Sequence, residues 1–153
     1  MQPQIISKPA FTVVGMQIRT TPVNPEIPQL WGRFAPRMDE VANLAEAHVS
    51  YGLMGNYAED MASFDYMAGV SVTSVGSLPE GMTSWEVPAC TYAVFDATIP
   101  TMGEVFGQIY NRWLATSSYH QSAPFAFEYY GEDFNPHDPN SQMSIYIPVE
   151  AKA

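Results

Sequence analysis

The sequence contains one cysteine, six basic residues and no long apolar run. With Cys90 alone no disulfide can form within the chain, and its apolar context, PACTYAVF, favours a small buried side chain over a nucleophile. No stretch approaches the roughly 18 consecutive apolar residues of a membrane span. The N-terminus also lacks the charged and apolar regions of a signal peptide. We therefore expect a cytoplasmic protein without a membrane partner.

The scarcity of Lys and Arg leaves a formal net charge of -10 at pH 7. A chain this acidic repels a phosphate backbone, and it has no basic stripe to offset the repulsion. We therefore expect no nucleic-acid binding by this chain alone. A field of this sign attracts cations, although acidity can also serve only to keep a protein in solution.

Signatures of cofactor and metal chemistry are missing as well. The sequence has no phosphate-binding Gly-rich loop, no dinucleotide fingerprint and no Gly-x-Ser-x-Gly elbow. His48, His120 and His137 stand too far apart for paired zinc ligands. The acidic turn GEDFNPHDPN lacks the glycine and the closing glutamate of a calcium-binding EF-hand. We expect neither a cofactor nor a metal ion, and we assign no catalytic residue.

The chain has 153 residues and is 46% hydrophobic, which is enough for one domain with a core. A helical pattern with an apolar stripe spans 25–44, and Pro36 predicts a break within it. A second helical pattern spans 101–114. Strands are predicted, from β-branched residues and alternation, at 10–19, 48–57, 64–72, 88–99, 125–131 and 144–149.

The order strand, helix, strand, strand occurs twice. KPAFTVVGMQI and VPACTYAVFDA share a Pro-Ala entry into an apolar strand, and each is followed by a helix with a Trp, Trp31 or Trp113. This pattern indicates a duplicated β-α-β-β unit, with halves of about 1–80 and 81–153 in one domain covering 1–153. We predict an α+β fold, one antiparallel sheet with two helices on one face and a ligand groove on the other.

Alternation assigns the side chains of PFAFEYYGEDF to two faces. Phe125, Phe127 and Tyr129 point one way, while Glu128 and Tyr130 point the other. We expect the Phe face to meet the helices, so that Glu128 and Tyr130 line the groove.

Five further side chains are predicted to reach the same groove. Alternation in the last strand places Tyr146 there, and alternation in 64–72 adds Asp65 and Met67. Met54 joins them if the strand keeps its register past its glycines, and Trp85, between the halves, could form a wall. The candidate ligand-binding residues are thus Glu128, Tyr130, Tyr146, Trp85, Met67, Met54 and Asp65.

A carboxylate among aromatic residues is costly unless something pairs with it. Ring faces attract cations, and methionines adapt to varied shapes. The set therefore suits a flat, apolar, positively charged ligand. The alternative is that Glu128 only hydrogen-bonds a tyrosine hydroxyl or water.

Four features together resemble the GyrI-like small-molecule-binding domains, also called AraC-type effector-binding domains. They are the duplicated order, VPACTYAVF, FEYYG and the closing IYIPV, with Cys90 where that family often has Gly. The resemblance implies a groove between the halves that binds amphipathic, often cationic compounds, with Glu128 meeting the cation. Many members are fused to a helix-turn-helix part that acts in transcription regulation. Because the duplication fills this chain, we expect a stand-alone bacterial binder, similar to members found as mobile gene-cassette products.

We therefore expect multidrug-type binding of lipophilic cationic small molecules without catalysis. One alternative is a hydrolase of reactive drug-like compounds, in which Glu128 acts as a general base. A further alternative is a modulator that binds a protein partner or a second copy of itself.

Overall fold

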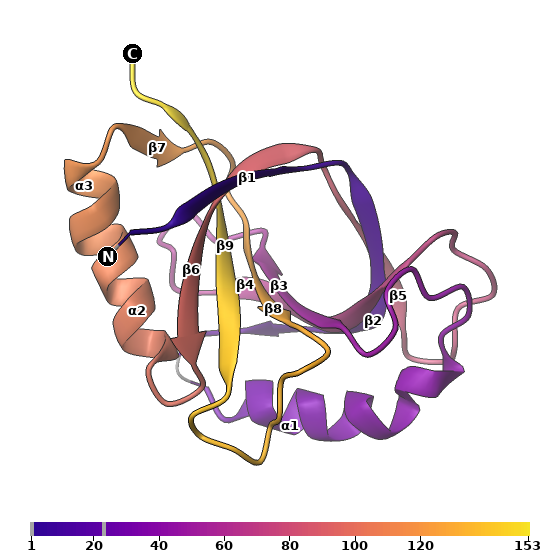
Figure 1. Ribbon diagram of the computed structural model, residues 1–153. Coiled ribbons are helices and arrows are strands. Elements are labelled where there is room, and N and C mark those ends of the chain that lie inside the picture. Colours follow the sequence, from indigo (N-terminus) through magenta and orange to yellow (C-terminus); the bar gives the residue numbers. More distant parts are fainter. Residues whose placement is uncertain (1, 23) are drawn as a thin grey trace.

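An antiparallel sheet is the central element of the computed structural model, which describes residues 2–22 and 24–153 (Figure 1). The strand order is β1-β6-β9-β8-β3-β4-β2-β5, and the short β7 pairs with β9. The bounds are β1 Gln4–Lys8, β2 Phe11–Thr20, β3 Ser50–Gly55, β4 Phe64–Val72, β5 Thr83–Val87, β6 Cys90–Thr98, β7 Tyr119–Gln121, β8 Ala126–Tyr130 and β9 Gln142–Ala151.

Two helical regions pack on one side of this sheet. The first is α1 (Glu26–Phe34), which buries Leu30 and Phe34 and is followed by the 3-10 helix η1 (Ala35–Glu40). The predicted break at Pro36 is confirmed, because the α-helical hydrogen bonding stops just before this residue. The second region is α2 (Met102–Gln108), the π-helical turn η2 (Ile109–Trp113) and α3 (Leu114–Thr116).

The strand order reads the same from either end once equivalent strands are matched. β3 and β8 meet at the centre, β4 and β9 flank them, and β2 and β6 follow. The outermost strands are exchanged, since β1 pairs with β6 and β5 pairs with β2. This is the arrangement that two β-α-β-β units joined edge to edge produce, and it confirms the predicted α+β fold.

Short links make the sheet curl. β1 and β2 are separated only by residues 9 and 10, yet β1 lies at one edge of the sheet and β2 next to the other. β5 and β6 are joined in the same way across residues 88 and 89. A flat sheet could not satisfy both links, so the strands bend round with the helices on the outer side (Figure 1).

Both faces of the curled sheet are buried. The helix-side core packs under α1 and α2 and includes Val14, Leu30, Phe34, Met54, Tyr66, Phe95, Ile109, Tyr130, Ile145 and Ile147. The inner core fills the curl and includes Val13, Tyr51, Leu53, Met67, Val87, Tyr92 and Phe127, with Phe11, Trp85, Phe125, Tyr129 and Tyr146 packed against it.

One face assignment from the sequence is wrong. Phe127 and its neighbours Phe125 and Tyr129 belong to the inner core, away from the helices. Tyr130 belongs to the helix-side core, and Glu128 lies on the same face. The groove was predicted on the face opposite the helices, but Glu128 points toward them.

Several strands were also not predicted. β1, β5 and β7 have three to five residues each, too few for the alternation that marks the other strands to be recognised. Across residues 2–22 and 24–153, no helix is long and apolar enough to cross a membrane.

Candidate ligand-binding site

Glu128 lies at the centre of the sheet, on β8. It is only 4% exposed, and its backbone pairs with Gly52 on β3 and with Ile145 on β9. It is the one acidic side chain among the buried residues of the described chain. A carboxylate in such a place requires hydrogen-bond donors or a counter-ion.

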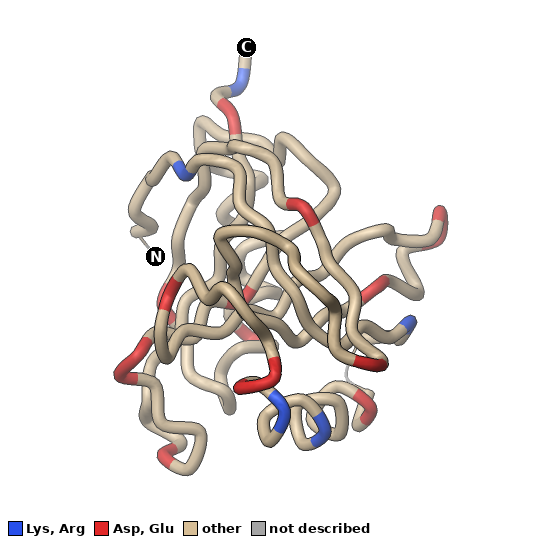
Figure 2. Tube along the Cα trace, turned by 90° about the vertical axis from the view of Figure 1, so that its right-hand side faces the viewer, with Lys and Arg blue, Asp and Glu red and all other residues tan. Residues whose placement is uncertain are grey.

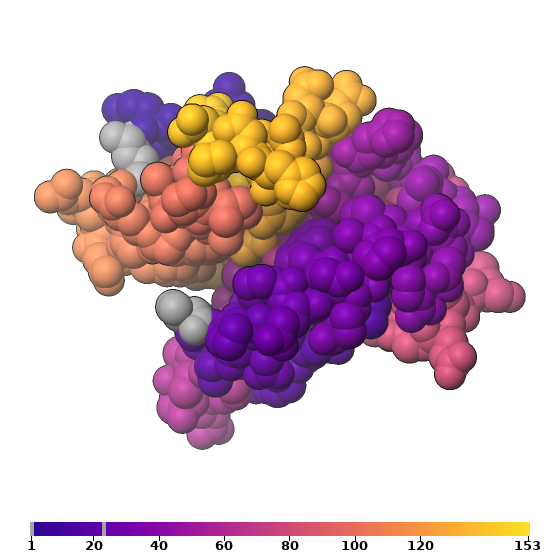
Figure 3. Space-filling view, turned by 90° about the horizontal axis from the view of Figure 1, so that it is seen from below, coloured from indigo at the N-terminus to yellow at the C-terminus, as the bar shows by residue number. Residues whose placement is uncertain are grey.

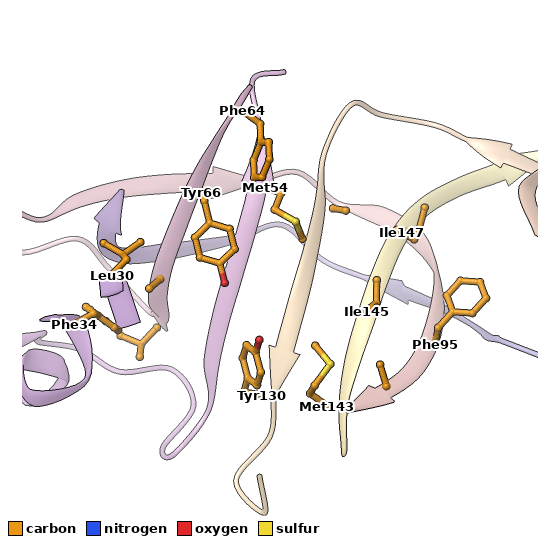
Figure 4. Packing of buried hydrophobic residues seen from close by; sticks show 14 of the residues in the cluster. Leu30, Phe34, Met54, Phe64, Tyr66, Phe95, Tyr130, Met143, Ile145 and Ile147 are labelled. Atoms are coloured by element: carbon orange, nitrogen blue, oxygen red, sulfur yellow. The ribbon is translucent and has the colours of Figure 1, made fainter. Parts of the chain in front are cut away.

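Two tyrosines supply the donors. The hydroxyl of Tyr66 on β4 donates to Glu128 Oε1 at 2.7 Å, and the hydroxyl of Tyr130 donates to the same oxygen at 2.8 Å. The two hydroxyls point toward one another from the two sides of β3 (Figure 4). The indole Nε1 of Trp31 on α1 donates to the Tyr66 hydroxyl at 2.9 Å, so a chain of hydrogen bonds links α1 to the carboxylate.

No cationic side chain of residues 2–22 and 24–153 forms an ion pair with this carboxylate. Within the described chain, ion pairs join Arg19 to Asp65, Arg37 to Glu40 and His120 to Glu150, and none involves Glu128. The second carboxylate oxygen, Oε2, has no hydrogen-bond partner among the described residues, and it is not one of their fully buried unpaired atoms. The site therefore holds an acid with two neutral donors on one oxygen and nothing on the other.

Burial dominates the electrostatics of the acid. Loss of solvation raises the pKa of Glu128 to about 6, although the hydrogen bonds from Tyr66 and Tyr130 lower it in part. At neutral pH the carboxylate is therefore mainly ionised. The same negative charge adds to burial in raising the pKa of both tyrosines, so they remain neutral donors.

Gly52 leaves room for this arrangement. A Cβ at Gly52 would collide with the Tyr66 hydroxyl and would lie 2.5 Å from Glu128 Oε1. The Tyr66 side chain on β4 reaches across β3 at this glycine to meet the carboxylate on β8. A glycine is thus needed here for space.

The registers relate Gly52 and Glu128 by the internal repeat. Aligning KPAFTVVG with VPACTYAV matches Gly15 to Val94. Gly15 pairs with Gly69 and Val94 with Tyr146, which makes the preceding residues, Ala68 and Ile145, equivalent. Gly52 pairs with Ala68, Glu128 pairs with Ile145, and the two pair with each other. The internal two-fold axis therefore passes between Gly52 and Glu128.

The site is closed by aromatic side chains. Trp31 packs edge to face on Tyr130, with ring centroids 5.5 Å apart, and Phe134 lies 4.9 Å from Tyr130 on another side. In the space-filling view from below, a furrow runs between the purple α1 region and the salmon α2 region (Figure 3). Burial, with Tyr110 and Glu128, raises the pKa of Tyr57 to about 12.

Larger hollows lie elsewhere on the surface. One of about 580 Å³ is lined by acidic and polar residues around the β8–β9 turn, and one of about 410 Å³ lies at the start of β2. Neither is lined by Glu128. The larger hollow is lined by Phe134, which also packs on Tyr130, so it adjoins the surroundings of the carboxylate on that side.

The seven predicted site residues separate into three sets. Tyr130 bonds to Glu128, and Met54 packs in the same helix-side core, where Figure 4 shows it beside Tyr66. Tyr146, Trp85 and Met67 belong to the inner core on the opposite face. The structure does not bring these three to Glu128.

Asp65 is also separate from Glu128. It pairs with Arg19 at 3.2 Å and accepts a hydrogen bond from Asn56 at 2.8 Å. It therefore already has a counter-charge, whereas Glu128 has none.

Three residues of the site were not predicted as such. Trp31 and Tyr66 fall within the predicted helix at 25–44 and the predicted strand at 64–72, but these patterns give no sign of the hydrogen bonds that their polar atoms make. Gly52 carried a signal, since a glycine within a strand often marks a close approach of side chains or backbone.

The chain carries few basic residues, and three of them, Arg33, Arg37 and Arg112, lie on the helical regions. Asp and Glu are spread over many loops, whereas Lys and Arg occur at few positions (Figure 2). A net negative field of this kind raises the local concentration of cations. Among the described residues, no group of three or more His, Cys, Asp or Glu side chains could hold a metal ion.

Comparison with known proteins is informative at this point. Residues 4–149 match the family model Cass2, described as an integron-associated effector binding protein. The chain belongs to this family. The resemblance to GyrI-like effector-binding domains is thereby confirmed.

The relatives of this effector-binding chain include a curated protein and solved structures. It is 41% identical over 152 residues to the transcriptional regulator BrlR of Pseudomonas aeruginosa, covering 97% of this chain and 56% of BrlR. It thus spans little more than half the length of that relative. It shares its fold with the integron cassette protein VCH_CASS2 of Vibrio cholerae (TM-score 0.66, 23% identity, 97% and 96% of the two chains). It also shares its fold with SAV2435, whose structure contains tetraphenylphosphonium (TM-score 0.76, 17% identity, 98% and 94%).

Proposed function

We propose that this protein binds lipophilic organic cations at Glu128, and that the guest supplies the counter-charge which the chain itself does not. The observation that carries this proposal is a carboxylate, 4% exposed, with two phenol donors and no cationic side chain in contact. Buried charges in proteins are as a rule paired with a counter-ion or coordinated to a metal. Here an incoming cation makes that pair.

The surroundings of Glu128 favour an apolar guest. The helix side of the sheet presents aromatic rings and a thioether near Glu128, from Trp31, Tyr66, Tyr130 and Met54. Ring faces attract a cation by about 0.5–2 kcal/mol each when water is excluded. SAV2435 supports the same class of guest, because its structure holds a lipophilic cation in a similar fold.

We expect binding to displace Trp31 from its place beside the two tyrosines. Trp31 fills the space over the two tyrosines and bonds to Tyr66, so the guest replaces an internal aromatic group with its own rings. The exchange is favourable only for a guest that brings both apolar surface and positive charge. This selects lipophilic cations over neutral or anionic compounds.

The test is titration of the protein and of Glu128→Gln with tetraphenylphosphonium and with neutral triphenylphosphine oxide. Glutamine keeps the acceptor oxygen for both tyrosines and removes only the charge. We expect the cation to bind about ten- to a hundredfold more weakly to the variant, the scale of a lost charge-assisted contact.

The controls separate charge pairing from general damage. Glu46→Gln is a matched variant, because Glu46 Oε1 also accepts hydrogen bonds from two hydroxyls, those of Tyr51 and Ser71. It should leave tetraphenylphosphonium affinity unchanged. Equal weakening of the cation and of the neutral compound by Glu128→Gln would refute charge pairing.

The hydrolase alternative makes a different prediction for the same residue. A general base at Glu128 would release product from an electrophilic drug-like ester in excess of the protein present. Recovery of such a compound unchanged, by mass spectrometry after binding, would favour the binder.

A further inference from the structure

On the opposite face of the sheet, aromatic rings surround a lysine ammonium group. The ammonium of Lys8, at the end of β1, lies over three aromatic rings. Its Nζ is 4.7 Å from the ring centre of Phe11, 5.6 Å from that of Tyr51 and 5.8 Å from that of Tyr146. These three rings, which we call the Lys8 cage, belong to or pack against the inner core.

An acid stands behind the cage. Tyr51 accepts a hydrogen bond from Lys8 Nζ at 3.4 Å and donates its own proton to Glu46 Oε1 at 2.6 Å. Ser71 donates to the same oxygen at 2.8 Å. Lys8 makes no direct ion pair with Glu46 within 4.0 Å, so the phenol relays the attraction between ammonium and carboxylate.

The cage is built for an ammonium group in general rather than for lysine. Ring faces and a relayed carboxylate recognise positive charge without fixed hydrogen-bond geometry, which is how aromatic cages bind methylated ammonium groups. Burial lowers the pKa of Lys8, while Glu46 raises it. Burial thus favours loss of the proton from Lys8. A quaternary ammonium has no proton to lose, so it stays charged in the cage.

The occupant can leave. β1 is an edge strand that pairs only with β6 among the described strands, and edge strands open more easily than central ones. Phe11 also lines the apolar surface hollow of about 410 Å³, together with Val87 and Pro88. Withdrawal of the Lys8 side chain would thus leave a ring-lined space next to an existing depression.

We propose that the Lys8 cage is a second cation-binding site, specific for small alkylammonium groups such as a trimethylammonium head, with Lys8 as its resident competitor. It differs from the Glu128 site in location, because it lies on the inner side of the curled sheet. It differs in guest, because the space vacated by a lysine side chain suits a small ammonium and not a large aromatic cation.

The test removes the competitor in a background where the first site has lost its charge. Choline is titrated by isothermal calorimetry into Glu128→Gln, Glu128→Gln with Lys8→Ala, and Glu128→Gln with Lys152→Ala. Lys152 is a matched control, since it is the other lysine of the chain and is exposed near the C-terminus. We expect Lys8→Ala to tighten choline binding by about tenfold or more and Lys152→Ala to have no effect.

Further arms define the recognition. The neutral carbon isostere of choline is 3,3-dimethyl-1-butanol. Its affinity should rise much less than that of choline when Lys8 is replaced by Ala. Adding Glu46→Gln should reverse the gain for choline. If choline binds the Lys8→Ala protein no better than the Lys152→Ala protein, the proposal is overturned. Because each titration uses Glu128→Gln, this result is independent of whether the first site binds cations.

A second measurement uses the unaltered chain and does not depend on the variants folding. Reductive methylation followed by peptide mass spectrometry reports the accessibility of Lys8 and Lys152. Lys8 should react more slowly than Lys152, and saturating choline, but not sodium chloride, should accelerate Lys8 alone. A Lys8 rate that choline leaves unchanged would also overturn the proposal.

Discussion

Gly52 and Glu128 face each other across the central strand pair, related by the internal repeat, and only one of them carries a side chain. The empty position is what allows Tyr66 to reach the carboxylate from β4. The hydrogen bond that Glu128 of the second half accepts from Tyr66 thus depends on Gly52 in the first half.

Gly52→Ala should disrupt the site. The added methyl group collides with the Tyr66 hydroxyl and with Glu128 Oε1, and overpacking of this kind costs about 1–3 kcal/mol. We expect a lower free energy of unfolding in urea and weaker tetraphenylphosphonium binding. Gly32→Ala is the matched control, because a Cβ there meets nothing within 4 Å. If Gly52→Ala behaves like Gly32→Ala, the crowding at the carboxylate is not real.

Cation binding should depend on pH through Glu128. Its pKa of about 6 means that the acid loses its charge as the pH falls below this value. If only the ionised form pairs with the guest, tetraphenylphosphonium should bind about tenfold more weakly at pH 5 than at pH 7 and change little above pH 7. Glu128→Gln should show a flat profile over the same range. A wild-type profile as flat as that of the variant would contradict the assignment.

The free energy of unfolding should fall as the pH rises, whereas the affinity for the cation should increase. The folded protein holds the Glu128 proton more tightly than the unfolded chain, in which the pKa is near its ordinary value of 4.5. This contribution is fully present below about pH 4.5 and is lost as the pH rises through about 6. The difference corresponds to about 2 kcal/mol. Relative to Glu128→Gln, the wild-type free energy of unfolding should fall by about this amount between pH 4 and pH 7, measured by urea denaturation.

Trp31 should respond to binding. A variant with Trp85→Phe and Trp113→Phe retains Trp31 as its single indole. Tetraphenylphosphonium should shift its emission to longer wavelength, because the indole leaves its packing against Tyr130 and gains contact with water. Trp31→Ala should speed association in stopped-flow experiments. An unchanged Trp31 spectrum at saturation would show that the guest does not pass this residue.

Much of the fold follows from local pattern. The strand at 64–72 was predicted with its observed bounds, and the break near Pro36 follows from the geometry of proline. The repeat of KPAF in VPAC predicted the two halves' matching order of elements. These features depend on neighbours in the sequence, which is why one sequence suffices for them.

The face of Glu128 could not be obtained in this way. Alternation separates Phe127 from Glu128, but it does not say which of the two faces meets the helices. The more apolar face was assigned to them, and this choice fails because the curled sheet buries an apolar face within itself. The curl follows from two-residue links between strands at distant sheet positions, a long-range feature that periodicity does not contain.

The exchange of β1 and β5 implies that neither half can complete its own sheet. A single β-α-β-β unit would have to trade its first strand with a twin, so the simplest ancestor of this chain is a homodimer. In such a homodimer the central pair would be two glutamates in collision or two glycines without charge. Covalent fusion lets the two halves differ at this pair, so that one keeps the acid while the other gives up its side chain.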